Sequence, residues 1–512
     1  MPTSPRAKAC LTEAALLVAW SATSTSHGSR PSPPAIVTRC PSDLSIPRHR
    51  SAVTEFPVTA SPFDGTTMTI RAMGHRISEA MSSNDPTLEG VTAAELRRDL
   101  LDARSRTLAT VSDLEDDRLI GPRLSIINPL LWEIGHLAWF QENWVLRHYA
   151  GEALTRDDAD ALYDSMKVHH DTRWDLPLPT RLDTLAYMRR VLERVLNMVR
   201  TDPVEPRLAY FVRHVTFHED MHGEAFIYTR QTLGYPAPEL GPRAKEALRR
   251  TALPPGDATI AGGTYPLGST PGAESFVFDN EKWAHPVHLE PFAISRRATT
   301  NGQFAAFVQD GGYARENLWT PEGWQWRSGI HAQHPVYWRP SGSGWAVRAF
   351  DRWAPLLEEG AIIHVNWYEA DAYCRWARRR LPTEAEWEAA AGGSDKRRFP
   401  WGNSFPESGV ANLDGVHGGA VDVNTLAAGD TSTGIRQLIG NVWEWTSSPF
   451  QSFPGFVPDP YREYSEPWFD GNHMVLRGGA WPTRSRLLRN TWRNFYAKDR
   501  SDVFAGFRTC AL

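Results

Sequence analysis

The sequence predicts a protein of two domains, an all-α four-helix bundle followed by an α+β domain. From about residue 90 to residue 240, apolar residues repeat with the period of amphipathic helices in four long segments. After residue 240, short strand-like runs, glycine turns and tryptophan motifs alternate instead. The chain of 512 residues is long enough to hold two or three domains.

Four parts of the chain follow from these patterns. We expect an N-terminal extension over residues 1–85, the bundle over 90–240, a linker over 241–256 and the second domain over 257–512. The extension is rich in Ser, Thr and Pro and lacks a helical or strand period, which predicts disorder. A start codon assigned too early explains it equally well.

Each of the four helices has its own signal. Thr92 followed by Glu95 forms a capping box that begins the first. Pro129 opens the second, "PLLWEIGHLAWFQENWVLRHY", whose apolar residues nearly encircle it and predict burial. The third and fourth cover about 182–199 and 207–234. The apolar stripe of the third consists of Leu182, Leu185, Met188, Leu192, Val195 and Val199.

Charge and cysteine content exclude several classes of partner. A net charge of −5 with no basic run gives no reason to expect nucleic acid or an anionic membrane surface. No apolar stretch reaches the roughly 20 residues that a membrane span needs. Four scattered cysteines without a CxxC pair fit a reducing compartment, so we expect a cytoplasmic protein.

The fourth helix contains "HVTFHEDMHGE", a dense group of histidines and carboxylates. His218 and His222 stand four residues apart, so their side chains lie one turn apart on one face and can chelate one ion. His214 lies one turn earlier, and three histidines in a row do not reach one ion comfortably. His136, in the middle of the second helix, is the candidate third ligand.

Three neutral imidazoles suit zinc, iron, copper or nickel, and the spacing does not choose among them. Glu219 beside His218 matches the HExxH pattern of zinc proteases, but no further zincin motif follows. The alternative interpretation of Glu219, Asp220 and Glu224 is a solvated helix face that supports the histidines.

The second half contains most of the 21 tryptophans, which predicts a loop-rich domain packed by indole rings. Its motifs include "RLPTEAEWEAAA", "GNVWEWTSSPF", "LRGGAW" and "FAGFR". Only one long helix is predicted here, over about 367–380.

These motifs resemble the formylglycine-generating-enzyme-type (sulfatase-modifying factor), C-type-lectin-like domain. The first half, with Gly135-His136 and "HEDMH", resembles a DinB-type bundle. The two in this order resemble the ergothioneine-biosynthetic sulfoxide synthases, also called hercynine oxygenases. The tail from "YREYSEPWF" onwards and "GHLAWFQENW" are most similar to the selenoneine synthase branch.

The resemblance implies an iron(II) enzyme that uses O2 to join sulfur or selenium to C2 of the imidazole of hercynine, the trimethylated betaine of histidine. The donor would be a selenosugar in the selenoneine branch, and cysteine or γ-glutamylcysteine in the ergothioneine branch. The implied iron ligands are His136, His218 and His222.

The resemblance also implies substrate and catalytic residues. Asn494 and Phe495 would lie by hercynine, and Arg500 by the chalcogen donor. Tyr496 stands where members that use γ-glutamylcysteine usually carry an aspartate, which disfavours that donor. The remaining implied residues are Arg173, which would hold a substrate carboxylate, and Tyr461 or Tyr464 as the catalytic tyrosine. The alternative from a different class is a zinc-binding hydrolase or a non-catalytic ligand-binding protein.

Overall fold

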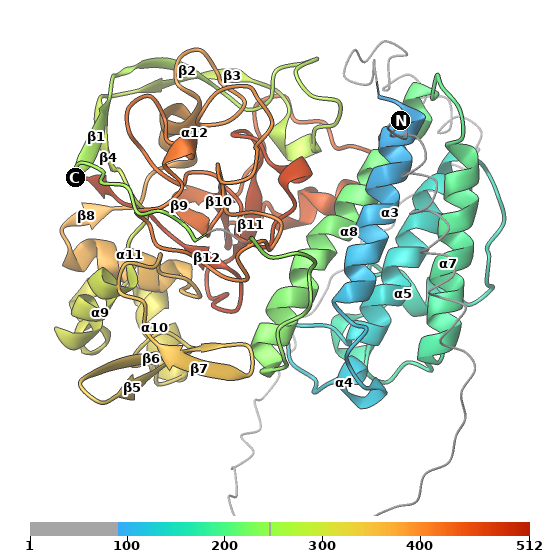
Figure 1. The fold of residues 1–512 in the computed structure, drawn as a ribbon, viewed down its shortest axis with the longest axis horizontal. Coiled ribbons are helices and arrows are strands. Elements are labelled where there is room, and N and C mark those ends of the chain that lie inside the picture. Colours follow the sequence, from blue (N-terminus) through green and yellow to red (C-terminus); the bar gives the residue numbers. More distant parts are fainter. Residues whose placement is uncertain (1–90, 245–246) are drawn as a thin grey trace, which may run out of the picture. The chain divides into compact units, whose positions relative to one another are not determined.

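The structure is a computed structural model that describes residues 91–244 and 247–512. It confirms the predicted fold of a helical bundle followed by an α+β domain (Figure 1). The expected extension over residues 1–85 lies outside the described residues. In the part of the chain that the structure describes, no helix is both long and apolar enough to cross a membrane.

Four long helices lie side by side in the bundle (Figure 1). They are α3 (Ala93–Ala109), α5 (Leu130–Gln141), α7 (Arg181–Met198) and α8 (Pro206–Leu233). The short helices α4 (Asp116–Ile120) and α6 (Ala159–Tyr163) lie in the connections. A π-helix, η3 (Glu142–Tyr149), continues α5 without a break.

The ends of these helices follow local chemistry. The capping box of Thr92 and Glu95 begins α3 as predicted, because each side chain satisfies a free backbone N–H of the other. Pro206 occupies the first turn of α8, where no N–H is needed. Gly234 ends α8 with φ of 65°, a left-handed conformation that glycine adopts without strain.

The apolar pattern predicted burial well, with one error. All residues of α5 are buried, as its encircling apolar residues predict. The stripe of α7 is buried at Met188, Leu192 and Val195. Leu182 does not belong to that stripe: it is 77% exposed, whereas Thr184 in the same first turn is buried, so the buried face of α7 begins at Thr184.

The second domain is built from small sheets. One four-stranded sheet has the order β1-β4-β13-β8, and another has the order β11-β10-β9-β12. The strands of the first are β1 (Asp257–Ile260), β4 (Phe292–Ser295), β13 (Cys510–Ala511) and β8 (Arg379–Arg380). Those of the second are β11 (Asn494–Ala497), β10 (His473–Arg477), β9 (Trp443–Pro449) and β12 (Ala505–Gly506).

A hairpin and a three-stranded sheet complete the strands. The hairpin pairs β2 (Gly263–Leu267) with β3 (His285–Leu289). The three-stranded sheet consists of β5 (Trp338–Ser341), β6 (Gly344–Ala349) and β7 (Arg352–Pro355).

The helix predicted over about 367–380 ends earlier, at Trp376, because Arg379 and Arg380 form strand β8, and three further short helices were not predicted. Besides α11 (Trp367–Trp376), the domain contains α9 (Asn301–Gln309), α10 (Pro321–Gly329) and α12 (Glu384–Gly392). Each has nine or ten residues, too few for a helical period to stand out in an apolar-rich sequence. Their caps carried the stronger signal, such as the capping box of Thr383 and Glu386 before α12.

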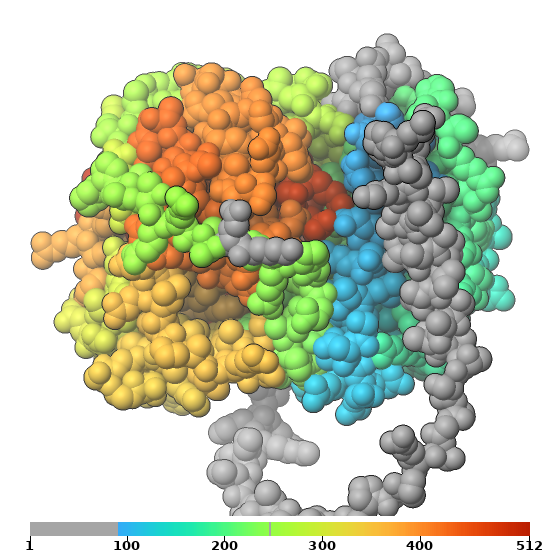
Figure 2. Space-filling view, viewed as in Figure 1, coloured from blue at the N-terminus to red at the C-terminus, as the bar shows by residue number. Residues whose placement is uncertain are grey.

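Helix α8 belongs to the bundle and also contacts the second domain. Figure 2 shows its C-terminal end, in light green, between the blue α3 and the yellow β5–β7 region. The amide of Gln231 donates to the carbonyl oxygen of Arg348 at 3.0 Å. On the other side, the guanidinium of Arg230 donates to Asp113 at 2.7 Å. The helix that carries two of the candidate ligands is therefore fixed by both domains.

Candidate metal centre

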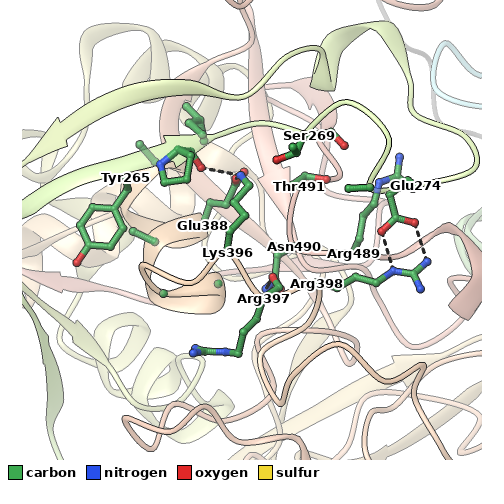
Figure 3. A pocket seen from close by; sticks show the side chains of 18 of the residues that line it. Tyr265, Ser269, Glu274, Glu388, Lys396, Arg397, Arg398, Arg489, Asn490 and Thr491 are labelled. Atoms are coloured by element: carbon green, nitrogen blue, oxygen red, sulfur yellow. Dashed lines mark hydrogen bonds and ion pairs between the residues drawn. The ribbon is translucent and has the colours of Figure 1, made fainter. Parts of the chain in front are cut away.

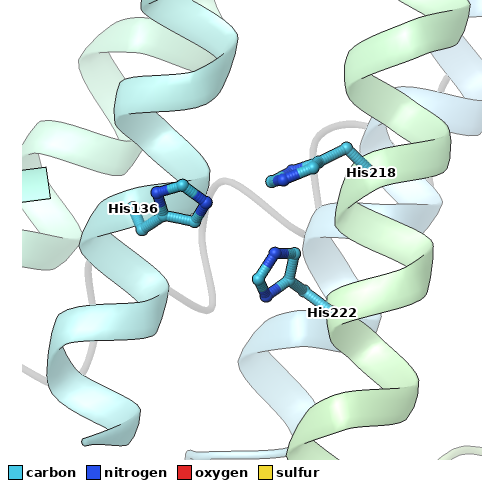
Figure 4. Close-up of side chains that lie close together, drawn as sticks. All are labelled: His136, His218 and His222. Carbon is cyan, nitrogen blue, oxygen red and sulfur yellow. The ribbon is translucent and has the colours of Figure 1, made fainter. Parts of the chain in front are cut away.

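The three predicted metal ligands lie together in the bundle. His218 and His222 project from successive turns of α8, and His136 faces them from α5 (Figure 4). One ligand atom of each lies within 4.8 Å of the others. Since His136 is separated from the α8 pair by more than 80 residues, only the packing of α5 against α8 completes the group.

Two of the imidazoles have a fixed orientation. Nδ1 of His136 lies 2.8 Å from the carbonyl oxygen of Tyr163. Nδ1 of His222 lies 2.7 Å from Oε1 of Glu133. In both rings Nδ1 faces an oxygen acceptor, so Nε2 is the ring nitrogen that is directed towards a metal. Glu133 was not among the predicted site residues, although its position one turn before His136 on α5 places it on the ligand face.

His218 packs differently. Its ring stacks on Phe140 at a centroid distance of 3.5 Å, and among the described residues its buried Nδ1 has no hydrogen-bond partner. Burial, followed by the neighbouring imidazoles, lowers the pKa of His218 well below its usual value. Burial has the same effect on the pKa of His136. Both rings are therefore neutral with a lone pair available, as a metal ligand requires. The residues present fit a divalent transition metal bound by three imidazoles.

His214 is not part of this group. It is buried one turn before His218, between Phe140 and Tyr461, and burial lowers its pKa to about 3. Within the described residues, neither ring nitrogen of His214 has a hydrogen-bond partner. His214 is therefore an uncharged ring that packs against aromatic side chains beside the centre.

The three carboxylates of α8 are not a solvated face. Glu219, Asp220 and Glu224 are 1%, 4% and 7% exposed. Glu219 accepts from Arg104 at 2.8 Å and from Gln141, which engages both of its oxygens away from the histidines. This arrangement disfavours the role of a protease general base. The carboxylates beside the histidines of α8 are therefore buried rather than exposed to solvent.

Two of these carboxylates connect the centre to the second domain. Asp220 forms a bidentate ion pair with Arg486, with both distances at 2.6 Å. Glu224 accepts from the indole of Trp443 at 2.7 Å and from the hydroxyl of Thr483 at 2.5 Å. Since Asp220 and Glu224 flank His222 in sequence, the second domain restrains the segment of α8 that carries this ligand.

Both candidate tyrosines come from one loop of the second domain. The ring of Tyr461 lies 5.1 Å from that of Phe140 and 5.7 Å from that of His214. The hydroxyl of Tyr464 points to Sδ of Met221 at 3.7 Å. Burial raises the pKa of both phenols above their usual value, so each keeps its proton at neutral pH. Both are therefore neutral phenols at neutral pH.

The ring of Trp132 lies between the guanidinium of Arg173 and the imidazole of His136. The guanidinium stacks 3.9 Å above the ring of Trp132, which in turn stacks on His136 at 5.0 Å. It donates to the amide oxygen of Asn128 at 2.6 Å. Within the described residues, no carboxylate oxygen lies within 4 Å of this guanidinium, and the side chain is largely buried. A buried cation without a paired carboxylate is suited to binding an anionic ligand group.

The predicted residues of β11 lie next to the tyrosine loop. The ring of Phe495 stacks on Phe450 at 4.0 Å and lies 6.1 Å from Tyr464. The side chain of Asn494 accepts from the backbone N–H of Phe495 at 2.8 Å, which fixes the local backbone. The ring of Tyr496 lies beneath the guanidinium of Arg500, 5.3 Å away.

Arg500 differs from Arg173 in its charge balance. It forms a bidentate ion pair with Asp502, with both distances at 2.7 Å, and Asp502 is buried. It also donates to the carbonyl oxygen of Ile126 at 3.3 Å. Since Asn128 binds Arg173, the two arginines lie at opposite ends of the short segment 126–128.

A separate cavity lies between β2 and α12 in the second domain (Figure 3). Its volume is about 440 Å³. The charged groups that line it are already paired, Lys396 with Glu388 and Arg398 with Glu274. Among the residues that the structure describes, none of the predicted site residues lines this cavity. The histidine centre therefore remains the candidate functional site.

Comparisons with known proteins agree with this architecture. Residues 99–226 match the model of the DinB superfamily. Residues 244–511 match the model of the sulfatase-modifying factor enzyme 1-like domain. The hercynine oxygenase of Mycolicibacterium thermoresistibile is 35% identical over 436 residues, which cover 81% of this chain and 94% of that protein. The chain belongs to the hercynine oxygenase family.

Other relatives match either most of this chain or about half of it. The hercynine oxygenase of Mycolicibacterium smegmatis is 33% identical over 79% of this chain and 96% of its own length. The formylglycine-generating enzyme of Streptomyces coelicolor is 32% identical but covers only 54% of this chain. Among solved structures, that of PvdO from Pseudomonas aeruginosa gives a TM-score of 0.36 at 19% identity, over 52% of this chain and 99% of its own. The two hercynine oxygenases therefore match across both domains, whereas the formylglycine-generating enzyme matches about half of the chain.

Proposed function

We propose that the protein is a non-haem iron(II), O2-dependent enzyme that forms a C–Se or C–S bond at imidazole C2 of hercynine. The observation that carries this proposal is the convergence of three histidine side chains, each with one ligand atom within 4.8 Å of the others, in a chain of the hercynine oxygenase family. Iron(II) bound by three histidines would supply open positions for O2 and for a soft chalcogenolate.

The proposed reaction balances without a further reductant. The C2–H bond of the imidazole and the Se–H or S–H bond of the donor break, and a carbon–chalcogen bond forms. O2 accepts four electrons, of which coupling supplies two and oxidation of the chalcogen supplies two. One oxygen atom remains on the chalcogen as an oxide, and the other leaves as water with the two hydrogens.

The bundle arginine supports the binding of one substrate carboxylate. Arg173 is a buried cation near His136 that has no paired carboxylate among the described residues, and we assign to it the carboxylate of hercynine. A trimethylammonium group forms no conventional hydrogen bond and is recognised by aromatic faces. Phe495, with Tyr464 and Trp468 nearby, offers such faces.

A buried phenol supports the proton transfer. Tyr461 is our candidate for the catalytic acid and Tyr464 is the alternative, since both remain protonated at neutral pH. A phenol beside the centre can donate a proton where negative charge develops on oxygen. The ring contacts of Tyr461 with Phe140, which itself stacks on His218, support its assignment.

We further propose a selenosugar as the donor rather than cysteine or γ-glutamylcysteine. The charge of Arg500, the residue expected beside the donor, is neutralised by buried Asp502. A second carboxylate-bearing substrate would have to compete with Asp502 for that guanidinium. A donor without a carboxylate, such as a selenosugar, does not meet this cost. Tyr496 in place of an acidic residue disfavours γ-glutamylcysteine.

Reconstitution tests the proposal. The apoprotein is loaded with Fe(II) without oxygen, then given hercynine, O2 and either a selenosugar or a thiol donor, with products identified by mass spectrometry. We expect coupling with the selenosugar, and loss of both iron and coupling in His218→Ala. His214→Gln, altered one turn away on the same helix, should retain its iron.

Other outcomes correct the proposal at different levels. Coupling with cysteine or γ-glutamylcysteine alone would move the protein to the ergothioneine branch. A purified protein that carries zinc and couples neither donor would refute the iron-dependent synthase and favour a zinc-binding hydrolase or a ligand-binding protein.

A further inference from the structure

One buried carboxylate holds both ends of the loop that carries the two candidate tyrosines. The loop runs from Asp459 to Ser465 and contains Tyr461 and Tyr464. The carboxylate belongs to Asp279, in the short helix η5 (Asp279–Glu281). The two segments are about 180 residues apart in sequence, so the contact exists only in the folded domain.

The contacts occupy both carboxylate oxygens. The hydroxyl of Ser465 donates to Oδ1 of Asp279 at 2.5 Å. The backbone N–H of Asp459 donates to Oδ2 at 3.4 Å. The amide of Asn280 donates to Oγ of Ser465 at 3.1 Å, which directs the serine hydroxyl proton towards Asp279. Each end of the loop is therefore bound by a different oxygen of one side chain.

A second contact reinforces the first end. Nζ of Lys282 lies 2.6 Å and 2.8 Å from the two carboxylate oxygens of Asp459. The ring of Phe278 stacks on Tyr464 at 4.5 Å. Residues on both sides of Asp279 thus contact the same loop, and the stacking extends to one of the tyrosines themselves.

Helix η5 is itself rigidly held. Its three residues are almost fully buried. Glu281 accepts from Arg489 at 2.9 Å and from Thr491 at 2.8 Å. The guanidinium of Arg493 donates to the carbonyl oxygen of Asn280 at 2.8 Å. A buried support that is hydrogen-bonded to three residues of the segment 489–493 can hold a loop in one position.

We propose that Asp279 is a positioning residue that holds the 459–465 loop so that its tyrosines lie beside the histidine centre. This inference rests on the proposed function, because it assigns a purpose to the proton-donating tyrosine. Asp279 itself does not contact the centre. A loop that carries a catalytic group needs such support, because a displacement of 1 Å can cost about 100-fold in rate.

Protonation of Asp279 offers a readout that a merely structural carboxylate would not give. Burial, followed by the charge of Asp459, raises the pKa of Asp279 to about 7, whereas the bonds from Ser465 and Asp459 and the charge of Lys282 lower it. Because the loop bonds favour the ionised form, ionisation must by linkage strengthen the hold on the loop. Loop protection should increase as pH rises through about 7 in the wild type and not in Asp279→Asn.

Hydrogen–deuterium exchange of the full-length protein, corrected for the intrinsic effect of pH, tests the proposal without relying on turnover. We expect exchange in the 459–465 loop to become about tenfold faster in Asp279→Ala and in Ser465→Ala, the effect of losing roughly one hydrogen bond. The control is Asp430→Asn, which breaks the ion pair of Asp430 with the buried Arg436 elsewhere in the domain. It should leave loop exchange unchanged.

Steady-state kinetics of the same variants complete the test. In Asp279→Ala we expect kcat to fall about 10- to 100-fold with the iron content unchanged. The KM for hercynine should rise less than kcat falls, because Phe495 and Trp468, which offer most of the proposed aromatic surface for its cation, lie outside the loop. Unchanged loop exchange, or faster exchange spread over the whole domain in both loop variants, would overturn the proposal. Faster loop exchange without a change in kcat would also overturn it. If the wild type itself shows no turnover, the proposed function fails while the exchange data still decide whether Asp279 holds the loop.

Discussion

The indole N–H of Trp443 in β9 donates to Glu224 of α8 at 2.7 Å, two residues after the candidate ligand His222. Both side chains are buried, and burial raises the pKa of Glu224. The bond joins the second domain to the helix that carries two histidines. The position of this segment of α8 therefore depends on a tryptophan more than 200 residues away in sequence.

Trp443→Phe tests this link. The substitution removes a donor to a buried carboxyl, so we expect a loss of about 1–3 kcal/mol in the free energy of unfolding and weaker metal binding. Urea unfolding and chelator competition measure the two effects. The matched control is Trp367→Phe, whose indole donates to the carbonyl oxygen of Thr446 within the second domain. Equal loss of metal affinity in both variants would contradict a specific link to α8.

Glu133→Gln should weaken the metal site directly. Glu133 accepts from Nδ1 of His222 and so orients its Nε2 towards the metal. The loss of such a carboxylate typically lowers metal affinity about 10- to 100-fold. A competition titration with a metal-binding dye gives the affinity. Glu193→Gln, on the exposed face of α7, serves as the control. An unchanged affinity in Glu133→Gln would mean that this hydrogen bond does not orient the ligand.

Arg173→Met should impair the binding of hercynine rather than the chemical step. The buried guanidinium is our candidate partner of the substrate carboxylate, and a charge-assisted bond of this kind is worth about 1.5–3 kcal/mol. The KM should therefore rise by about 10- to 100-fold. Arg123→Met is the control, because Arg123 is exposed and paired with Asp175 in the same region. An equal KM in the two variants would show that Arg173 does not bind the substrate carboxylate.

The pH dependence of stability should include a contribution from Glu369. Burial raises the pKa of this carboxyl to about 7, although Tyr313 and the N–H of Asn366 donate to it. A raised folded-state pKa contributes stability that is complete below the unfolded value of about 4.3 and is lost as pH rises through about 7.

Comparison with Glu369→Gln isolates this contribution, because other titrating groups cancel. Between pH 5 and pH 7, the wild type should lose about 2–3 kcal/mol of unfolding free energy relative to the variant. Urea unfolding at four pH values measures the difference. Parallel pH profiles of the two proteins would show that Glu369 titrates normally in the folded state.

Local chemistry explains which elements the sequence could predict. The capping box at Thr92, the proline at the start of α8 and the glycine at its end act within a few residues, so they are readable without a structure. The i, i+4 spacing of His218 and His222 is equally local. Short helices such as α9 and α12 escaped prediction, because nine residues contain too few turns to display a period.

By itself, the sequence determined the succession of a bundle and a tryptophan-rich domain, and the pair of histidines on one helical face. Tertiary structure decided which atoms meet. It brought His136 within 4.8 Å of that pair, placed Glu133 behind His222 and, in the part of the chain that the structure describes, paired Arg500 but not Arg173 with a carboxylate. These contacts join residues tens to hundreds of positions apart. Their energies depend on distance and burial in the folded chain, which no local pattern of residues records.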